Sequence, residues 1–244
     1  MRALSFAEML SVWERGWNRS PLDQALLILS AAQPDLPATA LEEMSIGQRD
    51  RELLELLAQT FGPKLACRAD CPQCNEELEF ALDVSQLRNS HAEADQQPLT
   101  ATVEECEIRY RTPNSEDLRA VAGSPDLTEA RRQLVLRCIT RASQGGVEKP
   151  VKLLPDTLTD HVSNLIVRAD PQLDTQVEIR CPACSHAWSA SFDIGSYFWS
   201  ELSAWARRSL WEVHALASAY GWSEADVLAM GPVRRHLYLE MAHG

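Results

Sequence analysis

Cys71-Pro72-Gln73-Cys74 and Cys181-Pro182-Ala183-Cys184 are two copies of one Cys-Pro-x-Cys motif, and the sequence after each copy matches as well. An Asp stands nine residues after the last Cys of each motif, as Asp83 and as Asp193. Apolar side chains alternate on the way there, which is the period of a half-buried strand. These positions are Leu78, Phe80, Leu82 and Val84 in the first copy and Trp188, Ala190, Phe192 and Ile194 in the second. Each motif is therefore predicted to be a tight turn that leads into a strand.

The spacing of the cysteines matches the chemistry of a zinc site. Two cysteines separated by two residues can direct both sulfurs at one point about 2.3 Å away, and proline stiffens the turn. Two such turns supply four thiolates, which close a tetrahedral shell and leave no position for water. The sequence thus predicts one structural Zn²⁺ per chain. We expect no catalytic residues and no residues that bind another cofactor. The expected ligands of the Zn²⁺ are Cys71, Cys74, Cys181 and Cys184.

Other interpretations of the cysteines remain open. Cys-Pro-x-Cys also occurs as a redox pair that opens a helix, and disulfides or free thiols are further alternatives. The strands expected after both motifs favour the metal, and the odd total of seven cysteines disfavours a simple disulfide framework. Cys67 stands four residues before Cys71 and His91 lies in a polar stretch, so either is an alternative ligand. Cys106 and Cys138 fit buried apolar positions better.

The separation of the two motifs sets the expected domain organisation. Residues 75–180, 106 in number, lie between them, far more than the usual 12–20 or so of a zinc site. We therefore expect an α+β protein, mainly helical, in which a small zinc ribbon of two Cys-Pro-x-Cys β-hairpin knuckles is joined across a long insertion. The expected parts are an N-terminal helical region (1–62), a zinc ribbon (63–194) with an inserted α/β subdomain (about 98–175), and a C-terminal helical region (195–244).

Apolar periodicity, capping residues and Gly or Pro stops predict the remaining elements. A Pro-rich joint around Pro34 and Pro37 is expected to separate the second helix from the third. Arg49, Asp50, Arg51 and Glu52 in that third helix are interpreted as a solvated face with local ion pairs, the alternative being a functional patch. Helices are expected over 5–16, 21–33, 46–60, 116–121, 127–141, 156–169, 196–220, 224–230 and 233–241, and strands over 101–111 and 177–179.

Composition excludes several classes of function. The chain has 23 Lys and Arg against 35 Asp and Glu, a net charge of −12, which argues against a general nucleic-acid binder. Its 244 residues contain neither a membrane-length apolar run nor a signal-peptide pattern, so we expect a cytoplasmic protein without membrane contact. No phosphate-binding glycine loop, His-Glu-x-x-His or Gly-x-Ser-x-Gly motif is present. We therefore expect no enzyme and no small-molecule substrate.

The C-terminal region raises one competing hypothesis. A long helix, the Gly221 turn and a short helix capped by Ser223 suggest helix-turn-helix DNA binding, which would make the protein a zinc-ribbon adaptor or regulator. The segment carries Glu224 and Asp226, however, and its aromatic-rich helix is more typical of a protein-docking surface or of core. Protein partners are therefore the favoured interpretation.

Four blocks of sequence carry a resemblance to a known family. They are Ser45-Ile46-Gly47 with Arg49-Asp50 and Phe61-Gly62-Pro63; Cys71-Pro72-Gln73-Cys74 with Leu78-Glu79-Phe80; Arg111-Thr112-Pro113 with Asp117-Leu118; and Tyr220-Gly221-Trp222-Ser223-Glu224 with Arg234-Arg235 and Tyr238-Leu239. Together they resemble the baseplate-hub family of T-even-type phages, whose relatives accompany phage-tail-like contractile injection systems. The resemblance covers most of the chain from about residue 40 onward. It implies a non-enzymatic structural component or chaperone-like assembly factor that binds baseplate or tail proteins.

Overall fold

Capped amphipathic helices at the two ends of the chain build one helical body. The computed structural model describes residues 1–88 and 98–243. The first four helices are α1 (Phe6–Gly16), α2 (Pro21–Ala32), α3 (Ala38–Glu43) and α4 (Ile46–Phe61). Three of them begin at a serine whose hydroxyl accepts the backbone N–H three residues on, at Ser5, Ser20 and Ser45. The predicted helices are confirmed here, whereas α3 is an addition, since Pro34 and Pro37, which both precede it, suggested only a joint.

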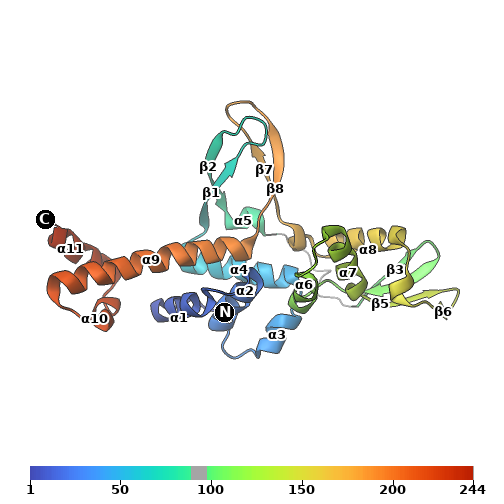
Figure 1. Cartoon of the computed structure of the whole chain (residues 1–244), viewed down its shortest axis with the longest axis horizontal. Helices are drawn as coiled ribbons and strands as arrows, with labels where there is room; N and C mark the ends of the chain where they lie inside the picture. Colours follow the sequence, from blue (N-terminus) through green and yellow to red (C-terminus); the bar gives the residue numbers. More distant parts are fainter. Residues whose placement is uncertain (89–97, 244) are drawn as a thin grey trace.

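The long helix α9 (Ile194–Tyr220) lies along this body (Figure 1). Its first half shares a core with α1, α2 and α4, in which Phe198 and Leu202 are fully buried. Four fully buried leucines of α4 complete that core, namely Leu53, Leu54, Leu56 and Leu57. Helices from both predicted terminal regions therefore stabilise each other in one hydrophobic core.

The chain reverses direction after α9. Gly221 adopts the left-handed conformation with φ 69°, and the short helices α10 (Glu224–Leu228) and α11 (Pro232–His243) fold back on the end of α9. Leu216, Val227 and Leu239 form a small separate core there. The predicted sequence of long helix, glycine turn and two short helices is confirmed.

Two β-hairpins stand together on the helical body (Figure 1). The first pairs β1 (Lys64–Asp70) with β2 (Glu77–Asp83), followed by the single turn α5 (Val84–Leu87). The second pairs β7 (Gln176–Arg180) with β8 (Ala187–Ser191), and both pairs are antiparallel. The strands predicted after each cysteine motif are confirmed.

The segment between the hairpins folds around a second core. A four-stranded sheet has the order β3 (Leu99–Val103), β4 (Cys106–Tyr110), β5 (Ile139–Gln144) and β6 (Val147–Glu148). Its helices are α6 (Ser115–Val121), α7 (Leu127–Cys138) and α8 (Asp156–Ala169), with 3₁₀ turns η2 (Val151–Leu153) and η3 (Pro171–Asp174). Ile108 and Ala142 of the sheet share the core with Cys138 and Val162. The protein is thus a mixed α/β protein with mainly helical mass and small sheets.

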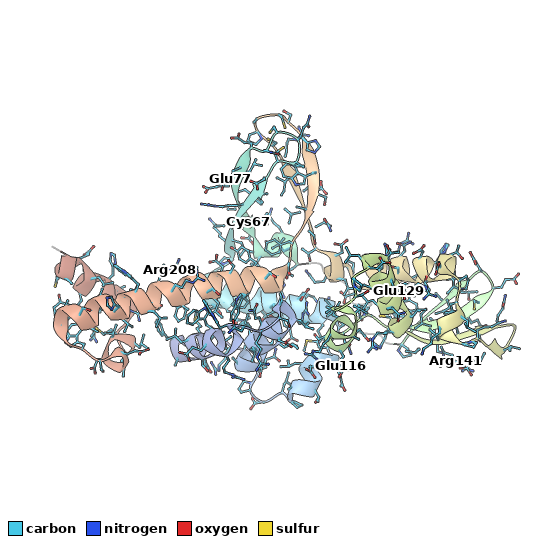
Figure 2. The ribbon with its side chains drawn as sticks, viewed as in Figure 1. Cys67, Glu77, Glu116, Glu129, Arg141 and Arg208 are labelled. Atoms are coloured by element: carbon cyan, nitrogen blue, oxygen red, sulfur yellow. The ribbon has the colours of Figure 1, made fainter. Side chains whose placement is uncertain are left out.

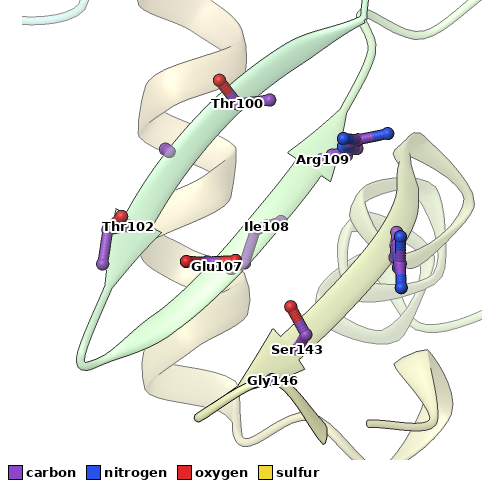
Figure 3. A pocket seen from close by; sticks show the side chains of 9 residues that line it. Thr100, Thr102, Glu107, Ile108, Arg109, Ser143 and Gly146 are labelled. Carbon is purple, nitrogen blue, oxygen red and sulfur yellow. The ribbon is translucent and has the colours of Figure 1, made fainter. Parts of the chain in front are cut away.

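The other face of this sheet is polar. Thr100, Arg109 and Arg141 lie side by side across three strands, because Arg109 pairs in register with both of the others. Figure 3 shows Thr100 and Arg109 with Glu107 and Ser143 around a shallow hollow of about 490 Å³, which Arg141 also lines. All the strands of the sheet lie between the two cysteine motifs in sequence, but the hollow itself contains no cysteine.

Two predicted elements of this part are wrong. The strand expected over 101–111 is two strands joined by Glu104 and Glu105, whose φ values of 49° and 65° build a tight hairpin turn. The helix expected over 127–141 ends at Cys138, and the chain continues at once as β5. Pairing of β5 with β4 outweighs the helical apolar period there, which illustrates how tertiary pairing overrides a local pattern.

Buried charges join the helical body to the α/β part. Arg51 forms an ion pair with the fully buried Asp170, with 3.0 Å between Nη1 and Oδ1, and the Ser45 hydroxyl lies 3.3 Å from Oδ2. Arg49, only 8% exposed, is paired with Asp50, and burial raises the pKa of Asp50 even though Arg49 opposes the shift. The interpretation of this helix face as solvated is therefore wrong for Arg49, Asp50 and Arg51, whose charges lie at an internal junction.

Backbone contacts reinforce the same junction. The N–H of Ile46 donates to the carbonyl of Pro113 at 2.9 Å, and Ser45 forms an isolated β-bridge with Asn114. Asp117, which is fully buried, is paired with Arg111 and with Arg137. Two of the blocks that carry the family resemblance thus meet where the two cores touch.

Candidate metal centre

The two cysteine turns have the same backbone hydrogen bonds. In the first, the N–H of Cys71 donates to the carbonyl of Glu76 and the N–H of Asn75 donates back to the carbonyl of Cys71, each at 2.9 Å. The second repeats both bonds at the corresponding positions, from Cys181 to His186 at 2.8 Å and from Ser185 to Cys181 at 2.9 Å. Asn75 and Ser185 adopt left-handed φ values of 57° and 61°. Each turn therefore presents its two sulfurs from the same local frame.

The four motif sulfurs converge at the tips of the hairpins. One ligand atom from each of Cys71, Cys74, Cys181 and Cys184 lies within 4.8 Å of all the others. The sulfurs of Cys71 and Cys184 are 3.6 Å apart, as are those of Cys74 and Cys181. A tetrahedron with bonds of about 2.3 Å has edges of about 3.8 Å, so the spacing fits a four-coordinate metal ion. A disulfide requires about 2.05 Å, and all seven cysteines are free.

Burial of the sulfurs is graded. Cys71 and Cys181 are almost fully buried, with 0% and 1% exposure, whereas Cys74 is exposed and Cys184 intermediate. The surrounding apolar cluster is small and contains Leu78, Phe80 and Trp188. The His186 ring stacks on Trp188 at 5.9 Å between centroids. Because so little apolar surface joins the two hairpin tips, the four thiols are the main feature that could hold them together.

Electrostatics of the metal-free thiols differ among the four. Burial raises the pKa of Cys71, but the backbone N–H groups of Cys74 and Gln73 outweigh it and lower the pKa to about 7. The N–H of Glu76 lowers the pKa of Cys74, yet the neighbouring sulfurs prevail and raise it to about 12. Four thiolates this close repel one another, and a bound cation is what would allow all four to ionise.

The remaining candidate ligands lie elsewhere. Cys67 is on β1 at the base of the hairpins (Figure 2), packs against the helical core and points its sulfur at the Leu65 carbonyl at 3.8 Å. The alternative prediction that Cys67 replaces one of the four ligands is therefore wrong. Cys106 and Cys138 are buried in the α/β core, as predicted. His91 lies outside the described residues. Both motifs lead into strands rather than helices, which removes the structural context of a helix-opening redox pair.

Sequence reasoning missed two features of this site. The strands β1 and β7 that complete the hairpins carry weak alternation, so only β2, β8 and part of β7 were predicted. The left-handed residues Asn75 and Ser185 were also missed, although Asn after Cys-Pro-x-Cys is a recognisable indication because Asn tolerates that conformation better than most residues.

Fold and site together define a class of protein that is mainly helical, has small sheets, and carries a cluster of four cysteines at the tips of two β-hairpins. A family model described as T4 bacteriophage base plate protein matches residues 28–199, which is 172 of the 244 residues and includes both cysteine turns. The chain belongs to the T4 bacteriophage base plate protein family. A search of curated proteins and a search of solved structures each gave no match.

Family membership supports a structural role in a phage baseplate and favours that role over catalysis. It also suggests interaction with other baseplate or tail proteins. Among the described residues, no helix combines the length and the apolar character that crossing a membrane would require. The family suggested by the sequence is thereby confirmed, and the match includes the first three blocks of the resemblance, whereas the fourth block, from Tyr220 to Leu239, lies outside the matched residues.

Proposed function

We propose that Cys71, Cys74, Cys181 and Cys184 bind one structural Zn²⁺ and that the two hairpins form a zinc ribbon. The observation that carries this proposal is the meeting of four sulfurs from turns that are 106 residues apart in sequence. Zinc prefers four thiolates in a closed tetrahedral shell, and its binding energy is folding energy where no site exists in the unfolded chain. The ion would therefore join two hairpin tips that little else connects, whereas the bases of the hairpins pack against the helical core.

The proposed role of this ribbon is mechanical. Both hairpins are continuous with the helical body, since β1 follows α4 and β8 precedes α9. Between them the inserted subdomain, about residues 98–175, has its own hydrophobic core. A metal at the hairpin tips would fix the two chain segments that enter and leave this insertion. The protein would thus present its helical and α/β surfaces to partners in a defined arrangement.

We propose that the protein is a non-enzymatic structural or chaperone-like assembly protein of a phage-tail-like contractile baseplate and that it acts in the cytoplasm. Family membership supports this proposal, and so do the large apolar side chains that are exposed on the surface. Its partners would be baseplate or tail proteins. The competing regulator hypothesis gains little support, because the net charge is −12.

Two measurements test the proposal. Elemental analysis of freshly prepared, reduced protein should give about one zinc per chain, and near-zero metal would contradict the zinc site. Pull-down of the tagged full chain from a producing cell should recover tail or baseplate proteins. A gel shift of DNA or RNA with a steep salt dependence, and no such proteins recovered, would instead favour the regulator.

A further inference from the structure

Exposed apolar side chains are concentrated outside the family-matched segment. Of thirteen large apolar side chains exposed among the described residues, eight lie in the 72 residues that flank positions 28–199. These eight are Met1, Trp17, Leu210, Trp211, Tyr220, Val233, Leu237 and Met241. Exposed aromatic residues beside arginine are the typical anchors of a protein–protein interface. The flanking helices are therefore the place to look for a docking surface particular to this chain.

The two tryptophans in this set belong to one continuous surface. Trp17 caps the C-terminal end of α1, and Trp211 lies on α9. The guanidinium of Arg207 lies over the Trp17 ring, 5.7 Å from its centroid. Trp211 follows Arg207 by four residues and Arg208 by three along α9, so its side chain neighbours each of the two arginines on the helix surface. We call Trp17, Arg207, Arg208 and Trp211 the Trp–Arg face. Figure 2 labels Arg208 on the stretch of α9 between the hairpins and α11.

Packing beneath the Trp–Arg face holds it in shape. The Trp17 ring meets Trp13 edge to face, with 4.9 Å between centroids, and Trp13 packs against the helical core. Trp199 of α9 lies against Gly16, where an added Cβ would be 2.5 Å from the Trp199 ring. Trp17 is nevertheless 50% exposed and Trp211 56% exposed. Rigid aromatic surface that is already ordered lowers the entropic cost of binding.

Charge selects the kind of partner. Neither Arg207 nor Arg208 has an ion-pair partner within residues 1–88 and 98–243. The family-matched segment carries 16 basic and 27 acidic residues, whereas the flanking residues carry 7 and 8. A cationic face on an otherwise acidic protein repels an identical face of a second copy, and the acidic remainder repels nucleic acid. It complements an acidic protein segment that also has apolar side chains for the two tryptophans.

We propose that the Trp–Arg face docks an acidic, partly apolar segment of another baseplate or tail protein. This proposal rests on the proposed baseplate function and names the chemistry of one partner. The arginines would pair with carboxylates, and the exposed ring surfaces of Trp17 and Trp211 would cover apolar side chains of the same segment. Zinc at the hairpin tips takes no part in this contact.

Site-specific cross-linking tests the proposal directly. His214 is exposed and follows Trp211 by three residues and Arg207 by seven, so it lies on the same side of α9. We expect a photo-reactive phenylalanine derivative at position 214, in the full chain in producing cells, to cross-link a tail-protein peptide rich in Asp and Glu. The same group at Leu127, which is 85% exposed in the family-matched part, should not give that product. Cross-links only to a second copy, nucleic acid, lipid or a basic peptide would overturn the proposal.

Once the cross-linked partner is purified, measurements of its affinity for the parent chain and for variants test the proposal quantitatively. Trp211→Ser and the double variant Arg207→Glu/Arg208→Glu should each weaken binding at least tenfold, and added salt should weaken it for the parent. Arg168→Glu reverses an exposed arginine of the matched part and should leave the affinity unchanged. Zinc content and melting temperature of each variant should equal those of the parent, which shows that folding is intact.

The outcomes separate this proposal from the baseplate function. If the parent chain recovers no tail or baseplate protein, the proposed function itself fails. If such proteins co-purify equally with the parent and with Arg207→Glu/Arg208→Glu, the function stands and the Trp–Arg face is not the docking surface. The absence of any cross-link at position 214 in cells where those proteins co-purify also overturns the docking proposal.

Discussion

Gly47→Ala is expected to destabilise the junction between the two cores severely. A Cβ atom at position 47 would lie 2.0 Å from both carboxylate oxygens of Asp170, whereas ordinary contacts begin at 3.4 Å. The carboxylate would have to move by about 1.4 Å, the difference between those distances. Asp170 is fully buried and accepts from Arg51, so the shift breaks a buried ion pair rather than displacing a mobile surface group.

The magnitude follows from these contacts. Leaving one partner of a buried ion pair uncompensated costs about 3–5 kcal/mol. Alanine gains back about 1 kcal/mol over glycine in a helix. A net loss of about 2–4 kcal/mol corresponds to a melting temperature lower by about 5–15 °C in a protein of this size. Denaturant or thermal unfolding followed by circular dichroism measures this change.

A control and a double-mutant cycle make the prediction specific. Gly123 has nothing within 4 Å of an added Cβ, so Gly123→Ala should change stability by no more than about 0.5 kcal/mol. In an Asp170→Ala background the clash at position 47 is gone, so Gly47→Ala should cost at least about 1 kcal/mol less than in the parent. Equal melting of the two glycine variants, or strict additivity in the cycle, would refute the reasoning.

Three further predictions concern the metal centre, a buried carboxylate and a turn. Cys71→Ser should cost several kcal/mol or prevent folding, whereas Cys67→Ser should be mild; a melt of Cys71→Ser identical to the parent contradicts the zinc site. Burial raises the pKa of Asp117, but hydrogen bonds from Arg111 and others outweigh it and lower that pKa. The stability advantage of the parent over Asp117→Asn should therefore be constant at pH 5–8 and shrink as the pH falls below about 4, where the unfolded carboxyl binds a proton first; a gap that widens in acid would contradict this. Replacing Glu104-Glu105 by Asn-Gly should raise the free energy of unfolding by about 1 kcal/mol, because both residues have positive φ; unchanged or lower stability would argue against the assigned turn.

Local chemistry explains why much of the site could be predicted. The Cys-Pro-x-Cys spacing specifies its own turn, and the alternation from Leu78 to Val84 specifies the strand after it. The helix starts at Ser5, Ser20 and Ser45 could also be predicted from the sequence, because a capping hydroxyl binds a backbone N–H within three residues of its own position. Pairing of the two turns was inferred from their likeness, and the structure brings the sulfurs together.

Features that depend on distant residues could not be predicted. The sequence around Gly47 indicates only an ordinary helix residue. The need for glycine becomes visible only in the structure, where Asp170, far along the chain, packs against it. Arg49 and Asp50 read as solvated for the same reason, since the surface that buries them comes from another part of the chain. The strand β5 carries a helical apolar period, and only its pairing with β4 decides its conformation.

The distance between the cysteine turns also has a consequence for biosynthesis. The ribosome must add residues 75–180 after the first turn before the second turn can begin to emerge. At about 5–20 residues per second, Cys71 and Cys74 wait roughly 5–20 s as an incomplete pair of thiols. During that interval they are open to oxidation and to capture by other soft metals. Timely delivery of the ion, or a reducing environment around the nascent chain, thus becomes a requirement for producing the protein in its native form.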